Sequence, residues 1–204
     1  MKRRGFTILE TVLVMSILSG LMLLVTIFFS RARHYTSETE TYSRVQRQAN
    51  ICIRKLADAF YSASRKYTQY YGNSVIFLSS DPVQSTDPRL EFDPLTGKIM
   101  WKKWMLFAHD AAKEEVYSEQ VPLDSPTAEL LNLPAPDVDL PYFASNALAT
   151  RRIVARNVKD FNVQGTGVSF IVTVTCEDSA PVPGRTDNDK IVEVSVTSEI
   201  SLLN

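Results

Sequence analysis

A run of twenty residues without a charged side chain, Thr11 to Ser30, constrains this chain of 204 residues more than any other feature. A helix needs about 20 apolar residues to cross the hydrocarbon core of a bilayer, so residues 6–30 are long enough to span a membrane. The Lys-Arg-Arg sequence at residues 2–4 supplies a positive flank before this segment. Positive flanks stay on the cytoplasmic side, so we expect one membrane-spanning helix with a cytoplasmic N-terminus.

One carboxylate, Glu10, lies at the start of this apolar segment. A carboxylate at membrane depth costs at least about 2.5 kcal/mol, so such a residue is expected to have a functional role and a cationic partner. An ordinary secretory signal has a shorter apolar region and an Ala-x-Ala-like cleavage site, and this sequence has neither. A plain single-pass anchor explains the apolar run but leaves Glu10 without a role.

Residues 4–10 read Arg-Gly-Phe-Thr-Ile-Leu-Glu, directly before the apolar run. This arrangement resembles the type IV prepilins and the pseudopilins of type II secretion. Their signature is a short basic leader, a glycine, Phe-Thr/Ser-x-x-Glu and an apolar stretch. Gly5, Phe6, Thr7 and Glu10 match that signature without departure. The body of the chain diverges widely within this family, so the resemblance rests mainly on the N-terminal segment.

The resemblance implies processing, a location and a partner for Glu10. A prepilin peptidase would remove the leader, residues 1–5, by cutting after Gly5 on the cytoplasmic side, and the new N-terminal Phe6 would be N-methylated. The protein would then sit in the inner membrane with a periplasmic domain until it is extracted into a pilus or pseudopilus. The amine of Phe6 on one subunit would pair with Glu10 of its neighbour, which makes the buried carboxylate tolerable after assembly.

Charge and proline content divide the rest of the chain at about residue 71. Residues 1–71 carry a net charge of +7 and residues 72–204 a net charge of −8. All ten prolines lie at Pro82 or beyond, and Gly20 is the one glycine between Phe6 and Tyr71. Proline and glycine are the strongest helix breakers, so we expect one continuous helix over residues 6–71, about 99 Å long. Its transmembrane half is 6–30, and its amphipathic, periplasmic half is 31–71.

The amphipathic half carries an apolar stripe with spacings of three and four residues, which is typical of one helix face. Sustained charge pairing of the kind found in coiled coils is absent, so we expect the rest of the chain to cover this stripe. The stripe consists of Tyr42, Val45, Ala49, Cys52, Leu56, Ala59, Ala63, Tyr67 and Tyr70, widened by Ile53 and Phe60.

Residues 72–204 have the alternating apolar pattern and the turn residues of a β-rich globular domain. Within Ile191–Ile200, Val192, Val194 and Val196 alternate with polar residues, so we expect one buried and one wet face. The other expected features are strands at 74–79, 90–92, 99–107, 153–163 and 167–176, a hairpin turn at 93–97, a Pro-rich connection at 122–141 with a helical turn at 127–131 as an option, and a loop at 177–190.

The expected fold class is therefore α+β, with a long N-terminal helix packed on a C-terminal antiparallel sheet. This layout is the pilin fold that the N-terminal resemblance implies. Residues 153–161 also resemble the Val-x-x-Phe strand of J-type minor pseudopilins and of the related W-type minor pilins.

The residues that could form a metal or nucleic-acid site also have ordinary structural explanations. Neither His34 nor His109 has a second histidine or a cysteine at zinc-ligand spacing, so we expect no zinc site. Asp187 and Asp189 are weak candidates for calcium ligands, because alternating carboxylates suit Ca²⁺ but also occur in ordinary turns. The basic and indole side chains of residues 98–104 could stack on single-stranded nucleic acid, although a strand with one aromatic face explains them too. The acidic body argues against nucleic acid as a partner.

The sequence contains two cysteines. Cys52 and Cys176 could form a disulfide in an oxidising compartment, or could be two small buried apolar residues.

No nucleophile elbow, phosphate-binding loop or dinucleotide-binding glycine pattern occurs in the sequence, so we expect neither an enzyme nor a cofactor.

The favoured interpretation is a J-like minor pseudopilin, a structural subunit that initiates or caps the pseudopilus of a type II secretion system. Its expected partners are other pseudopilins or pilins, contacted through the N-terminal helix, the prepilin peptidase and the inner membrane. A minor pilin of a type IV pilus is the alternative within the family. A membrane-tethered binding protein or enzyme is the alternative from another class. Cleavage after Gly5 distinguishes the first two from the third.

Overall fold

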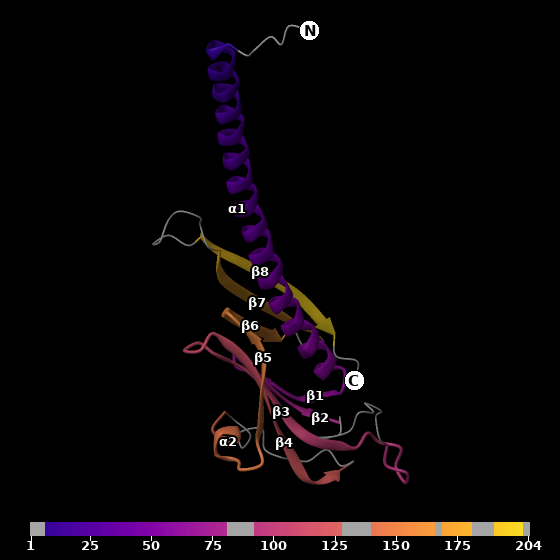
Figure 1. The fold of residues 1–204 in the computed structure, drawn as a ribbon. Coiled ribbons are helices and arrows are strands. Elements are labelled where there is room, and N and C mark those ends of the chain that lie inside the picture. Colours follow the sequence, from indigo (N-terminus) through magenta and orange to yellow (C-terminus); the bar gives the residue numbers. More distant parts are fainter. Residues whose placement is uncertain (1–6, 81–91, 128–139, 166–168, 181–189, 202–204) are drawn as a thin grey trace. The chain divides into compact units, whose positions relative to one another are not determined.

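A computed structural model describes residues 7–80, 92–127, 140–165, 169–180 and 190–201 (Figure 1). A long, apolar N-terminal helix is followed by antiparallel β-sheets, so the expected α+β fold class is confirmed. The elements in chain order are α1 (Ile8–Phe60), β1 (Ala63–Tyr70), β2 (Ser74–Ser79), β3 (Trp101–Asp110), β4 (Glu115–Thr127), α2 (Leu140–Ser145), β5 (Thr150–Arg156), β6 (Val158–Gly165), β7 (Ser169–Ala180) and β8 (Lys190–Ser201).

The chain forms two compact units. The first comprises Met1–Thr41 and Ser179–Val192, and the second comprises Tyr42–Asp178 and Glu193–Asn204. Within the first unit, the Lys190 ammonium forms an ion pair with the Glu38 carboxylate. The hydroxyl groups in the apolar part of α1 donate to carbonyls one turn earlier, as Ser16 does to Val12 at 2.9 Å. Such bonds satisfy polar side chains in apolar surroundings without a partner from outside the helix.

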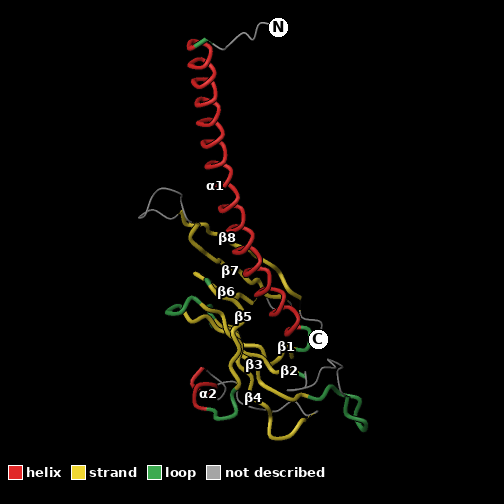
Figure 2. The backbone as a smooth tube through the Cα atoms, in the orientation of Figure 1, coloured by secondary structure: helices red, strands yellow, loops and turns green. Residues whose placement is uncertain are grey.

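The strands form two sheets (Figure 2). One has five strands in the order β1-β2-β3-β4-β5, so neighbours in the sequence are neighbours in the sheet. The other has three strands in the order β6-β7-β8. In β8, Val192 and Val194 are buried while Ile191, Glu193 and Ser195 are exposed, which confirms the predicted alternation.

The core of the second unit forms where the apolar stripe of α1 meets both sheets. Phe60 at the end of α1 stacks on Phe77 of β2 with ring centroids 4.5 Å apart, and its centroid lies 3.8 Å from that of Phe170 of β7. The prediction that the chain itself covers the stripe is therefore confirmed, except at Tyr42, which is 49% exposed. The buried helix residues are Val45, Ala49, Cys52, Leu56 and Phe60.

The helix ends at Phe60, so the prediction of a continuous helix to residue 71 is wrong. The Ser62 hydroxyl donates to the Ala59 carbonyl at 3.0 Å and satisfies an acceptor of the last turn. The following residues form β1, which pairs antiparallel with β2. Ala63, Tyr67 and Tyr70, expected on the helix stripe, therefore lie on a strand.

The strand expected over 153–163 is two strands that belong to different sheets. Asn157 separates β5 from β6 and has a left-handed backbone, with φ of 57°. Asparagine tolerates this conformation better than most residues. The Val158 amide donates to the Glu114 carbonyl at 2.8 Å, and the Glu177 amide donates to the Asn157 carbonyl at 2.9 Å. These bonds fix the point at which the chain leaves one sheet and enters the other.

The hairpin turn at 93–97 is confirmed. The Gly97 amide donates to the Asp93 carbonyl and the Asp93 amide donates to the Lys98 carbonyl, both at 2.8 Å. The expected Pro-rich connection begins inside β4, which runs to Thr127 and was not predicted as a strand. Residues 128–131 of the optional helical turn lie outside the described residues, as do residues 90–91 and 181–189.

Candidate functional site at the N-terminal helix

The first half of α1 presents an apolar surface that no other described part of the chain covers. The large apolar side chains from Ile8 to Phe29 are all exposed, whereas those of the second unit mostly lie in its core. Among the described residues, α1 is the one helix that is long and apolar enough to cross a membrane. A contiguous apolar surface of this size marks a site of contact with lipid or with another protein. The structure is thus compatible with the expected membrane anchor.

Thr7 and Glu10 form a capping box at the start of α1. The Thr7 amide and hydroxyl donate to Glu10 Oε2 at 3.0 and 3.1 Å, and the Glu10 amide donates to Thr7 Oγ1 at 3.3 Å. These reciprocal bonds satisfy amides that would otherwise lack a partner at a helix N-terminus. The signal Thr-x-x-Glu before an apolar run is present in the sequence and by itself predicts this capping box. Gly5 and Phe6 lie outside the described residues.

Cys52 and Cys176 lie in the same core cluster as free, buried thiols. Burial raises the pKa of the Cys52 thiol to about 12, with a further contribution from nearby Cys176, and burial raises the pKa of the Cys176 thiol to about 11. Thiols are nucleophilic only as thiolates, so both are inert near neutral pH. Of the two readings of this pair, the structure shows two small buried apolar residues.

We expect both thiols to resist alkylation in the native protein and to react after unfolding without a reductant. The measurement is the intact mass after maleimide treatment, with and without denaturant. Two labels per unfolded chain support the free thiols seen here. An unfolded chain that takes up no label would instead reveal a bridge formed in the oxidising compartment.

The aromatic residues of the 98–104 segment are not available for stacking on nucleic acid. Trp101 and Trp104 are buried in a second core cluster, and Trp104 lies edge-on to Tyr67 with centroids 6.5 Å apart. Lys103 is also buried, and its ammonium donates to Gln120 Oε1 at 3.3 Å. Stacking requires exposed rings, so the structural explanation, a strand with an aromatic face, is the correct one.

The remaining candidates contribute no metal site to the described structure. His109 Nε2 lies 2.7 Å from the Val158 carbonyl oxygen and so joins β3 to the start of β6. Asp187 and Asp189 lie outside the described residues. No group of three or more potential metal ligands occurs in the ranges that the structure describes.

Comparisons with protein-family models, with curated proteins and with solved structures found no match.

Proposed function

We propose that this chain is a J-like minor pseudopilin, a membrane-anchored structural subunit that initiates or caps the pseudopilus of a type II secretion system. The observation that carries the proposal is the Gly5-Phe6-Thr7-x-x-Glu10 sequence at the start of a helix whose apolar surface is exposed. An anchor alone requires the apolar helix. It does not require a glycine before Phe-Thr, or a carboxylate four residues beyond the would-be new N-terminus.

The course of α1 supports this proposal in a second way. The same helix is exposed and apolar from Ile8 to Phe29 and buried along one face from Val45 to Phe60. A subunit with this layout can keep its β-rich unit folded while its apolar segment exchanges lipid for the helices of neighbouring subunits. Lipid tails and the helices of neighbouring subunits are similarly apolar. The apolar segment can therefore move from the membrane to the filament without refolding of the β-rich unit.

We expect the mature protein to lack Met1–Gly5 and to carry one added methyl group on Phe6. The measurement is the intact mass of the protein extracted from the membranes of its own host. Gly5→Val should block cutting completely, because the family's peptidase cuts after this glycine. Gly20→Val is the matched control, since a Cβ at Gly20 would meet no described atom within 4 Å apart from its chain neighbours and the adjoining turns of helix backbone. It should be processed like the unmodified chain.

A full-length chain in cells with an active prepilin peptidase would contradict the proposal. It would favour a membrane-tethered protein that keeps its anchor. Cleavage together with crosslinks to the subunits of a type IV pilus, rather than to pseudopilins, would select the minor-pilin alternative. Cleavage thus tests membership of the family, and the crosslinks test whether the subunit belongs to a pseudopilus or to a pilus.

A further inference from the structure

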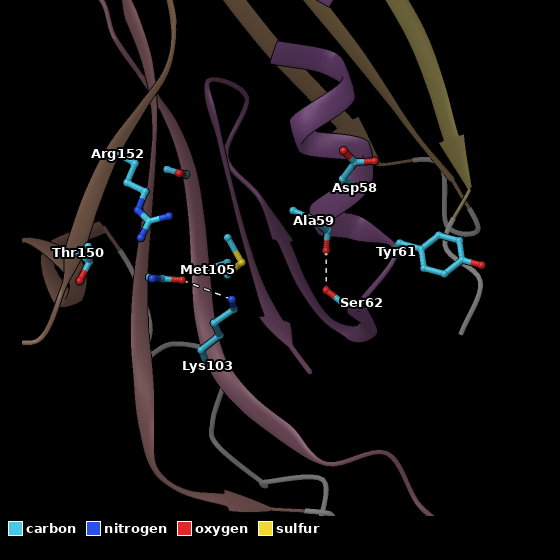
Figure 3. A pocket seen from close by; sticks show the side chains of 10 residues that line it. Asp58, Ala59, Tyr61, Ser62, Lys103, Met105, Thr150 and Arg152 are labelled. Carbon is cyan, nitrogen blue, oxygen red and sulfur yellow. Dashed lines mark hydrogen bonds between the residues drawn. The ribbon is translucent and has the colours of Figure 1, made fainter. Parts of the chain in front are cut away.

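A pocket of about 400 Å³ lies on the five-stranded sheet, next to the last turn of α1 (Figure 3). The helix end covers the sheet near β2, where Phe60 stacks on Phe77, and the pocket lies where the same sheet face continues over β3, β4 and β5. Its walls combine charged, amide and hydroxyl groups. They are formed by Asp58, Ala59, Tyr61, Ser62, Lys103, Met105, Ser118, Gln120, Thr150 and Arg152.

Two cations face the space in front of β4. Figure 3 shows the Lys103 ammonium and the Arg152 guanidinium pointing toward the same part of the pocket. Gln120 lies between them in the sheet. It pairs with Met105, two residues from Lys103 on β3, and with Thr150, two residues from Arg152 on β5. The amide oxygen of Gln120 accepts from Lys103, which leaves the amide NH₂ group as a further donor.

Arg152 differs from the other arginines of β5. Arg151 pairs with Asp110 at 3.2 Å and lies over the Tyr117 ring, and Arg156 pairs with Glu115 at 3.2 Å. No hydrogen bond or ion pair reaches the Arg152 guanidinium from any residue that the structure describes. An arginine fork that no described residue engages is suited to a planar anion that accepts two hydrogen bonds.

We propose that this pocket binds a carboxylate group. The Arg152 guanidinium, which no described residue engages, and the amide NH₂ group of Gln120 offer hydrogen-bond donors to the two oxygens of one carboxylate. Asp58 in the same lining would repel the two charges of a phosphate more strongly than the single charge of a carboxylate. The carboxylate comes either from an acidic side chain of a partner protein or from a small carboxylic acid. This site is independent of the pseudopilin proposal, because binding can be measured on the unprocessed chain.

The methyl group of Met105 lines the pocket, so its NMR signal can report binding there. The full chain, labelled with ¹³C at its methionine methyl groups and held in detergent micelles, is titrated with a capped alanine peptide that contains one glutamate. Butyrate, which carries the same carboxylate on a small molecule, is the second probe. We expect each saturating probe to shift the Met105 signal, and the peptide with glutamine in place of glutamate to leave it unchanged.

Arg152→Gln should weaken binding about tenfold or more, because charge-assisted bonds to a carboxylate are lost. Arg156→Gln, on the same strand but paired with Glu115, is the matched control and should keep the affinity of the unmodified chain. Tighter binding of the peptide than of butyrate would assign the site to a partner's acidic side chain, and equal binding would assign it to a small carboxylate.

Three results would overturn the proposal. These are no saturable shift of Met105, unchanged affinity in Arg152→Gln, and inorganic phosphate binding more tightly than both carboxylates.

Discussion

Replacing Phe60 with alanine is expected to lower the free energy of unfolding of the β-rich unit by about 3 to 5 kcal/mol, as is typical for buried phenylalanines. Phe60 is 1% exposed and lies between Phe77 of β2 and Phe170 of β7, so its ring joins the helix to both sheets. Its loss leaves a cavity that these neighbours cannot fill. Denaturant unfolding of the full chain in micelles, followed by the fluorescence of Trp101 and Trp104, measures the change.

The adjacent residue provides a control for this substitution. Tyr61 is 66% exposed, so Tyr61→Ala should change stability by no more than about 0.5 kcal/mol. Equal effects at the two positions would mean that the end of α1 is not docked in the core as the structure shows.

Elements with a clear two-residue or one-turn periodicity were predictable from the sequence. The alternation of Val192 and Val194 with polar neighbours correctly gave the buried face of β8. The spacing of Val45, Ala49 and Cys52 correctly gave the buried face of α1. In both cases the pattern and the burial arise from the same local geometry, so no knowledge of tertiary structure was needed.

The end of the helix and the split of the 153–163 segment were not predictable in this way. Residues 61–71 contain neither proline nor glycine, so nothing local forbids a helix there. The hydrogen bonds that β1 makes to β2 decide its structure, and pairing of this kind depends on partners rather than on intrinsic propensity. The change of sheet at Asn157 depends on one left-handed residue and on a bond from Val158 to Glu114, 44 positions away by numbering.

The candidate sites also differ in how far the sequence alone predicts them. Thr7 and Glu10 are three residues apart, and their spacing alone indicates a helix N-terminus. The pocket brings together Asp58 of α1, Lys103 of β3 and Arg152 of β5, which are far apart in the sequence. Their meeting depends on strand order and register, and composition reveals neither. In the sequence, Lys103 belongs to a basic and aromatic segment, and its burial shows that this segment is structural.

Glu10→Ala and Glu10→Gln are expected to separate two roles of this carboxylate. Glutamine can keep the capping box, because its amide oxygen can accept from the Thr7 amide as Glu10 Oε2 does now, whereas alanine cannot. Both substitutions remove the negative charge. If the charge pairs with the Phe6 amine of a neighbouring subunit, as the proposed function requires, both variants should insert and fold normally but fail to enter the filament.

The loss should be large, because leaving one partner of a buried ion pair uncompensated costs about 3 to 5 kcal/mol, which corresponds to a decrease of about a hundredfold or more in docking. The measurement is crosslinking to neighbouring pseudopilins in the native host, together with secretion or piliation, after cleavage and membrane localisation have been confirmed. If only Glu10→Ala fails, Glu10 acts through the helix end and the charge pair is wrong. If both variants assemble like the unmodified chain, neither role contributes to assembly, and the carboxylate at membrane depth needs another partner.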